Sequence, residues 1–317
     1  MLYSIVLMFV DAFSLTFTLL LIVFLISRLI AKDIYITSKF YALFITYCIL
    51  DAFFMCDQYL NRRLAYFGYF RDFYTTEYPK SALSSITFVY FYSYGIAMSL
   101  SNISVAFNRL SAISFPVYYN QLWKGWKLMF FISFPMTICF IHLWYFMDIK
   151  IEYQLFGDGS MVPNFRPDSK VDLWFFLILV RVFSFIVSGY MHYLLITQLR
   201  NKISIKKTAE RNPVSAAELN LIKYAQVFYF VTTFTLIFEG ILMLCGYFKW
   251  RDVINLMDRL YLPLETMQSF FSPYTLVYIN KDIRQKFFEF LHLKKKRFVK
   301  KSTITSAVSF TVSRGTM

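Results

Sequence analysis

Residues 102–127 read NISVAFNRLSAISFPVYYNQLWKGWK, and they mark the place where a long apolar run gives way to polar chain. The run closes with Asn108, Arg109 and Leu110, a proline follows at Pro116, and an aromatic and basic connection leads to the next apolar run. An arginine is tolerated at such a boundary because its long side chain reaches the polar side of a membrane interface. On these residues alone, Arg109 is either an anchor for a helix end or a contact for a partner protein.

The composition is that of a membrane-embedded chain. Of 317 residues, 58% are hydrophobic and only 16% are charged, whereas a soluble domain carries about 25% charged residues. The net charge of +14 invites a nucleic-acid partner. We exclude that partner because the basic residues sit in the gaps between apolar runs rather than over a soluble surface.

Seven apolar runs are each long enough to cross about 30 Å of hydrocarbon as a helix. They cover residues 2–31, 40–59, 82–107, 128–147, 173–198, 224–248 and 256–279. Helices are expected because every backbone polar group in lipid must find its hydrogen bond within the chain. The sequence therefore predicts an all-α membrane protein, a seven-transmembrane helix bundle formed by residues 1–293.

Lys and Arg divide unevenly between the two sides of such a bundle. The segments 28–39, 108–127, 199–223 and 280–317 hold 22 basic and five acidic residues, whereas 57–81, 148–172 and 249–252 hold nine of each. Cytoplasmic segments carry the excess of Lys and Arg, which predicts an outside N-terminus and a cytoplasmic C-terminus. One connection opposes this orientation with four basic residues: Arg62, Arg63, Arg71 and Lys80.

Residues 281–293 predict a short amphipathic cytoplasmic helix, since Ile283 and Phe287 fall on one face beside basic residues. The basic residues 294–297 suit the anionic lipid of the inner leaflet. Residues 294–317 are basic and rich in Ser and Thr, so we expect a disordered tail that is open to phosphorylation.

Ionisable residues inside a membrane are expensive and are candidates for function. Arg181, Glu239 and Glu265 each lie about eight or nine residues from the outer end of their span, which is about 12–14 Å at 1.5 Å per residue. Two interpretations stand: the floor of a ligand cavity, or a buried ion pair that only fixes helix packing. Glu239 is the first partner expected for Arg181, and Glu265 the second.

Other polar residues in the runs carry weaker hypotheses. Asp51 stands alone in the second run and is either a switch or a structural acid that is protonated or linked to sodium. Asp11 is expected to be solvated near the outer end, and His142 is expected to be a packed donor between helices. The four cysteines are expected to be small buried hydrophobes, because no metal-type spacing or CxxC motif is present. We predict no metal and no cofactor.

Three motifs resemble those of rhodopsin-like G-protein-coupled receptors. Asn108-Arg109-Leu110 before Pro116 resembles the Asp-Arg-Tyr motif, whose arginine serves the G-protein-facing end. Pro273 with Tyr278 resembles the Asn-Pro-x-x-Tyr motif, and Asp51 matches the acidic residue of the second helix. The chain departs from that pattern because Asn108 replaces the acid before Arg109, so no ion pair forms there and weak restraint with some basal activity is expected.

FNRLSAISFP, the following Trp123 and the segment 209–212 are similar to nematode serpentine chemoreceptors of class gamma, with class v as the nearest competitor. The resemblance implies a chemosensory receptor of the plasma membrane and of sensory cilia. It implies a small-molecule ligand and a heterotrimeric G protein as partners, with arrestin and a receptor kinase at the tail.

Two other classes of protein were weighed against a receptor. A ligand-gated seven-helix channel or a transporter also carries charge within the membrane, but transporters often show repeated halves, and no internal repeat is visible here. An enzyme is rejected because the three histidines lie on separate segments, and HExxH, GxSxG and Walker motifs are absent from the sequence.

Overall fold

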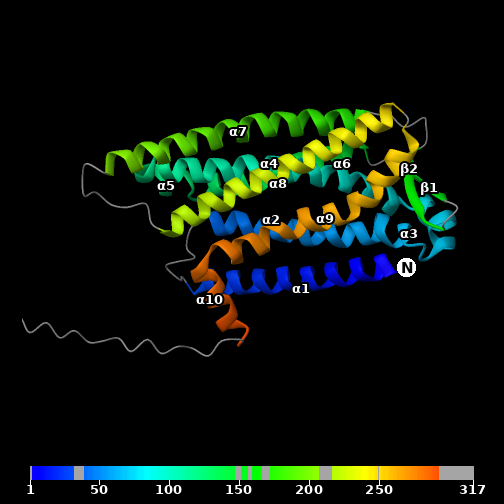
Figure 1. Cartoon of the computed structure of the whole chain (residues 1–317), viewed down its shortest axis with the longest axis horizontal. Helices are drawn as coiled ribbons and strands as arrows, with labels where there is room; N and C mark the ends of the chain where they lie inside the picture. The colour runs from blue at the N-terminus through cyan, green and yellow to red at the C-terminus, as the bar shows by residue number, and fades with distance from the viewer. Residues whose placement is uncertain are drawn as a thin grey trace, which may run out of the picture.

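The computed structural model describes residues 2–31, 39–146, 151–155, 159–165, 172–206, 216–248 and 250–292. Seven long helices run side by side along the molecule (Figure 1). They are α1 (Leu2–Ile30), α2 (Lys39–Gln58), α4 (Ala82–Ser114), α6 (Trp126–Phe146), α7 (Asp172–Lys206), α8 (Ala216–Tyr247) and α9 (Arg251–Ile279). Among the described residues, six of these are apolar enough to cross a membrane, while α9 carries five charged residues in its N-terminal half. The predicted all-α, seven-helix membrane bundle is confirmed.

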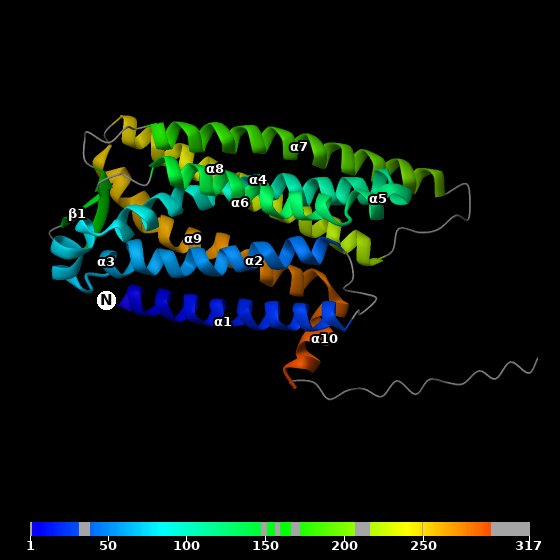
Figure 2. The same cartoon turned by 180° about the vertical axis from the view of Figure 1, so that it is seen from behind.

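Helix α4 is the centre of the bundle. It packs against α2, α6, α7 and α8, whereas α9 closes the bundle against α1, α2 and α8. Figures 1 and 2 show the two faces of this arrangement, with α1 at one edge and α7 at the other. The interior is rich in aromatic rings, and Phe40, Tyr224 and Trp123 mark the half nearest α10 (Lys281–Phe290).

The second helix continues well past residue 59, where the apolar run ends. A π-helical turn, η1 (Tyr59–Arg63), and a last turn, α3 (Leu64–Tyr66), prolong α2 without a break. The helix predicted from hydropathy ended at residue 59, because the polar residues Asn61, Arg62 and Arg63 are typical of a loop. The turn instead remains inside the bundle, since all three side chains are buried.

The N-terminal end of the bundle carries a cap that the sequence did not predict. The cap consists of η2 (Phe73–Glu77), η3 (Tyr78–Lys80) and the antiparallel strands β1 (Ile151–Leu155) and β2 (Met161–Phe165). The register pairs Ile151 with Phe165 and Leu155 with Met161. Both segments were expected to be plain connections, because short elements that depend on tertiary contacts leave little periodicity.

Tyrosine hydroxyls fasten the cap to the end of the second helix. Tyr153 donates to the Asn61 carbonyl at 2.6 Å, and Tyr74 donates to the Leu60 carbonyl at 2.6 Å. Burial raises the pKa of Tyr74 and of Tyr78 to about 12 and also raises the pKa of Tyr153. The cap is therefore held by neutral phenols.

The opposite end of the bundle carries two short helices. Helix α4 runs to Ser114 rather than to residue 107, and α5 (Pro116–Leu122) follows at once in what was expected to be loop. Helix α10 (Lys281–Phe290) is the predicted amphipathic helix, with Ile283 and Phe287 buried. Figure 2 shows α5 and α10 at the end away from the N-terminus. Residues 209–212 and the tail 294–317 lie outside the described residues.

All four cysteines lie in described helices, and all are free thiols. Cys48, Cys139 and Cys245 are buried as expected, but Cys56 is exposed on the side of α2, so the prediction of a buried residue was wrong for Cys56. An outward-facing apolar thiol is tolerated there because the surface of a spanning helix meets lipid rather than water.

Candidate functional site

A buried charge pair inside the bundle joins α7 to α8. Arg181 Nη1 forms an ion pair with Glu239 Oε2, and both side chains are buried. Tyr261, on α9, donates a hydrogen bond to Glu239 Oε1 at 3.0 Å. The first pairing expected from the depth count is therefore present, and three helices meet at one carboxylate.

Arg181 has room for its guanidinium because the facing residue of α4 is a glycine. A Cβ built on Gly95 would lie 2.9 Å from Arg181 Cζ, closer than real Cβ atoms approach. Nothing around position 95 in the sequence pointed to this role, because an isolated glycine inside a helix has many uses. Gly95 therefore belongs to the site as a spacer.

Glu265 does not join Arg181, contrary to the expectation of one shared layer. It binds Arg62 Nη1 at 3.1 Å through Oε1, and its Oε2 lies 3.8 Å from Arg63 Nη2. A count from the span ends gives the depth of a residue but not the direction of the helix face that carries it. Glu265 faces the prolonged second helix, while Glu239 faces α7.

Asp11 is buried, with 1% of its surface exposed, so the expectation of a solvated residue was wrong. Arg63 Nη1 pairs with Asp11 Oδ2, which also accepts a hydrogen bond from Tyr59 at 2.6 Å. Thr266 donates to Asp11 Oδ1 at 2.7 Å and accepts from Arg63 Nη2 at 3.0 Å. A carboxylate held away from water needs such partners, and these tie α1, η1 and α9 together.

We call Asp11, Arg62, Arg63 and Glu265 the cap-side charge cluster, because they lie toward the end of the bundle that carries the cap. It connects with the Arg181–Glu239 pair through Tyr261, because the Arg62 guanidinium lies 5.0 Å from the centre of the Tyr261 ring. The cluster and the pair together contain three arginines and three carboxylates, so their formal charges cancel. Sequence reasoning missed Arg62 and Arg63 as site residues, although one signal was present: the connection 57–81 had more basic residues than an outer connection should.

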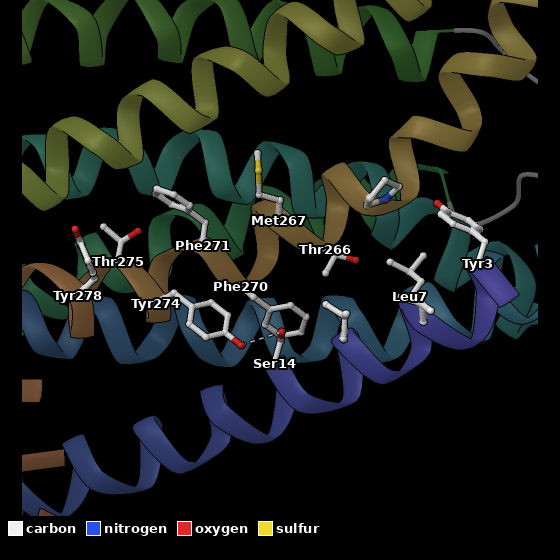
Figure 3. Close-up of a pocket in the computed structure, with 13 residues that line it drawn as sticks. Tyr3, Leu7, Ser14, Thr266, Met267, Phe270, Phe271, Tyr274, Thr275 and Tyr278 are labelled. Carbon is white, nitrogen blue, oxygen red and sulfur yellow. Dashed lines mark hydrogen bonds between the residues drawn. The ribbon is translucent and has the colours of Figure 1, made fainter. Parts of the chain in front are cut away.

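Two kinds of space lie near these charges. The cavity that Arg181 lines, with Asn102, Ser184 and Gln268, measures about 10 Å³, which is room for one water molecule. A groove of about 780 Å³ runs between α1 and α9, with Thr266 in its wall (Figure 3). The cap-side charge cluster is therefore next to ligand-sized space, whereas the Arg181–Glu239 pair is enclosed.

Asp51 is not alone in the centre of the bundle. Tyr94 donates a hydrogen bond to Asp51 Oδ1 at 2.6 Å, and its ring stacks on Phe54 with 3.7 Å between centroids. Asp51 thus ties α2 to α4. A hydrogen bond of 2.7 Å joins His142 Nδ1 to Ser93 Oγ, with the donor set by the histidine tautomer. This contact between α6 and α4 agrees with the expected role of a packed interhelical partner.

Arg109 lies within α4 near its C-terminal end and is only 4% exposed. Its Nη2 donates to Asn108 Oδ1, and its guanidinium lies 4.4 Å from the centre of the Phe40 ring on α2. Asn108 Nδ2 in turn donates to the Tyr119 hydroxyl on α5 at 3.2 Å. Asn108 forms no ion pair, as expected, but Arg109 is more restrained than expected, by a neutral acceptor and a cation–π contact.

The remaining motif residues occupy separate places. Pro116 begins α5, whose end is fixed to α4 by Trp123 Nε1 donating to Ser111 Oγ at 2.8 Å. Pro273 lies inside α9. Tyr278 is 79% exposed and lines the α1–α9 groove, so it points away from the core. Within the described parts of the chain, no group of His, Cys, Asp and Glu is arranged to hold a metal.

The comparisons agree with this architecture. A family model described as serpentine type 7TM GPCR chemoreceptor Srv matches residues 7–293. No curated protein matches the chain. The receptor superfamily expected from the motifs is confirmed, and the class that matches is Srv, named above as the class v competitor, rather than class gamma. Since the match spans all seven long helices, this chain belongs to the serpentine 7TM chemoreceptor family Srv.

Proposed function

We propose that this receptor binds a small molecule from its outer side and activates a heterotrimeric G protein at the end that carries α5 and α10. The observation that carries the proposal is Arg109, a buried arginine at the inner end of the central helix. The hydrogen bond that the charged guanidinium donates to Asn108 contributes about 1.5–3 kcal/mol net. A ligand-driven movement of α4 against α2 can offset a cost of this size, because allosteric coupling energies are typically about 1–3 kcal/mol.

On the ligand side, we propose that the Arg181–Glu239 pair and Glu265 respond to the bound molecule. Their support is a continuous network that joins five helices of the bundle and runs in the order Asp11, Arg63, Glu265, Arg62, Tyr261, Glu239 and Arg181. A ligand that shifts α9 changes both ends of this network. We place the protein in the plasma membrane of sensory cells, cilia included, with an outside N-terminus. Arrestin, a receptor kinase and anionic lipid are proposed partners of residues 294–317.

The test compares Arg109→Ala with Arg28→Ala in cells that report G-protein activation. Arg28 is a matched control because it also lies at the inner end of its helix, over the ring of Phe24. During an odorant screen, Arg109→Ala should lower coupling by about tenfold, within the range of allosteric coupling energies, while surface expression is retained. Equal signalling by both variants would return Arg109 to the role of an anchor. A ligand-triggered current without G-protein activation would instead favour the channel.

A further inference from the structure

Helices α4 and α7 pack against each other along a seam of small polar side chains. Ser184 Oγ donates to the Ser99 carbonyl, and Asn102 Nδ2 donates to Ser188 Oγ at 3.5 Å. Small residues of this kind let two helix backbones approach closely inside a membrane. The cavity of about 10 Å³ lies beside this seam, and α8 and α9 complete its wall.

Two polar atoms of the residues that line this cavity are buried without a hydrogen bond. Among the described residues, neither Asn102 Oδ1 nor Arg181 Nε has a partner, although Asn102 is only 2% exposed and Arg181 only 8%. The Nη1 atom of the same guanidinium is held by Glu239. A buried polar atom without a partner is costly. The wall therefore offers one unused donor and one unused acceptor to the occupant of the cavity.

The orientation of the Asn102 amide follows from its neighbour on α7. The Ser188 hydroxyl donates to the Ser184 carbonyl at 2.6 Å, so toward Asn102 it can only accept. Asn102 must therefore present Nδ2 to Ser188, which is not part of the cavity wall. Oδ1 is left as the atom of this amide that can accept a hydrogen bond from the cavity side.

We propose that the cavity binds one ordered water molecule, which accepts a hydrogen bond from Arg181 Nε and donates one to Asn102 Oδ1. The volume of about 10 Å³ admits a water molecule and nothing larger. A chloride ion can accept from Nε but cannot donate to Oδ1, and a sodium ion would lie beside the positive guanidinium. Water is the ligand of this size that satisfies both atoms.

The second proton of the water has acceptors in the same wall. Thr232 and Thr233 of α8 line the cavity, and each donates its own hydroxyl proton to a carbonyl of the preceding turn, at 2.9 and 2.8 Å. Their hydroxyl oxygens keep lone pairs that can accept from the water. With Arg181, Asn102 and one of these threonines, the water has about three polar partners, which is typical of a buried water.

The bound water connects the Arg181–Glu239 pair with the central helix. Asn102 lies two turns before Arg109 in α4, about 10 Å along the helix at 1.5 Å per residue. A displacement of the Arg181 guanidinium is therefore passed through the water to the part of α4 that carries Arg109. This consequence rests on the proposed function, whereas the water site itself does not.

The experiment is radiolytic labelling of the full-length receptor in phosphatidylcholine nanodiscs. A short X-ray pulse converts water to hydroxyl radicals, which oxidise the nearest side chains, and peptide mass spectrometry locates the added oxygen. Phe185 lines the cavity, whereas Phe183, on the same helix, does not. Phe183 is 60% exposed and Phe185 only 36%, so exposure alone predicts more label on Phe183. A water in the cavity should reverse this order.

Two variants remove the water by different means. Asn102→Leu keeps the approximate size of the side chain and removes the acceptor. Thr232→Ile adds bulk to the wall from α8, and overpacking of so small a cavity displaces its occupant. Each variant should reduce the label on Phe185 to the level of Phe183. If Asn102→Leu fails to fold, the parent and Thr232→Ile decide the question.

Ser101→Ala and Thr197→Ile are the matched controls. Ser101 is a buried neighbour of Asn102 on α4, and Thr197 lies on α7 with its hydroxyl exposed; neither residue lines the cavity. Both controls should label like the parent.

Label on Phe185 of the parent that does not exceed the label on Phe183 would overturn the water site. Label on Phe185 that persists in either folded variant, Asn102→Leu or Thr232→Ile, would overturn it too, because the radicals would then come from bulk solvent. The readout is independent of signalling. A receptor with the expected labelling but without G-protein activation would therefore keep the site and lose the proposed function.

Discussion

At the scale of single residues, Gly95 decides how closely α4 and α7 approach at Arg181. We expect Gly95→Ala to displace the guanidinium from Glu239, because the added methyl group would overlap with it. Removing one partner of a buried pair costs about 3–5 kcal/mol, and this is an upper bound here because the guanidinium is the far end of a flexible side chain and can shift. The variant should therefore melt below the parent in a detergent thermal-unfolding assay.

Gly240→Ala is the matched control for this substitution. Gly240 lies in α8, and a Cβ built there meets nothing within 4 Å. The change from glycine to alanine inside a helix should be neutral or stabilise the protein by up to about 1 kcal/mol. Equal behaviour of the two variants would show that the contact between Gly95 and Arg181 does not limit the packing of α4.

Neutralisation separates a ligand role of the Arg181–Glu239 pair from a packing role. Arg181→Gln or Glu239→Gln alone leaves one buried charge without its partner, which costs about 3–5 kcal/mol, so surface expression should fall. The double variant should recover expression because no lone charge remains. If the recovered receptor still responds to ligand, the pair is a packing device. Normal expression and signalling from both single variants would contradict the buried pair.

The sequence predicted this pair but not its surroundings. Arg181 and Glu239 were found because a charge inside an apolar run is conspicuous and its depth can be counted. Arg62 and Arg63 were assigned to a loop, because hydropathy cannot distinguish a polar loop from a polar helix turn that faces buried carboxylates. Gly95 gave no signal at all, since its role exists only opposite Arg181.

At the scale of elements, the cap should respond to high pH. Its tyrosines are more easily ionised in the unfolded chain, where the pKa is about 10, than in the fold, where Tyr74 and Tyr78 reach about 12. Their contribution to stability is complete below about pH 10 and is lost as the pH rises towards 12. Tyr153→Phe should lower the melting midpoint at pH 7 by about 2–4 °C and flatten its decline above pH 10.

Tyr145→Phe provides the control for this prediction. Tyr145 is 66% exposed near the same end of the molecule, so loss of its hydroxyl should change neither the midpoint nor the alkaline decline. Scans of tryptophan fluorescence against temperature at several pH values measure both. A decline above pH 10 that is identical in Tyr153→Phe and the parent would exclude the cap as its origin.

The elements that escaped prediction share a physical reason. The β-hairpin and the turns η1 to η3 are short, and tertiary contacts stabilise them, such as Tyr153 with Asn61 and Tyr74 with Leu60. Helix α10, in contrast, was predicted with its buried face because Ile283 and Phe287 repeat at helical spacing. Periodicity is visible in a sequence, whereas a contact between distant segments is not.

At the scale of the whole molecule, the two sides of the bundle differ more in their content of Lys and Arg than the count from the sequence indicated. Arg62 and Arg63 are buried against Asp11 and Glu265, so they do not belong to the outer connection. Their removal takes two of the nine basic residues from that side. We expect an N-terminal epitope tag to stain on intact cells and a C-terminal tag only after permeabilisation. An N-terminal tag visible only after permeabilisation would reverse the map and place Arg109 outside.

The fold as a whole followed from run lengths, because the hydrocarbon thickness sets how many apolar residues a spanning helix needs. The helices themselves run further than those runs. Helix α4 exceeds its apolar run by seven residues, from 107 to 114, because Asn108, Arg109 and Ser111 find partners inside the protein. Hydropathy detects the part of a helix that crosses the hydrocarbon. It does not detect the polar helix ends that pack against other parts of the protein.

The free state of all four thiols has a consequence for making the protein. The cap is held to the bundle by hydrogen bonds from phenol hydroxyls to backbone carbonyls, so folding requires neither an oxidising compartment nor a disulfide isomerase. Synthesis in a cell-free lysate with lipid nanodiscs and dithiothreitol throughout should yield receptor with the same melting midpoint as material from the secretory pathway. Bacterial cytoplasmic membranes become a practical source for the same reason.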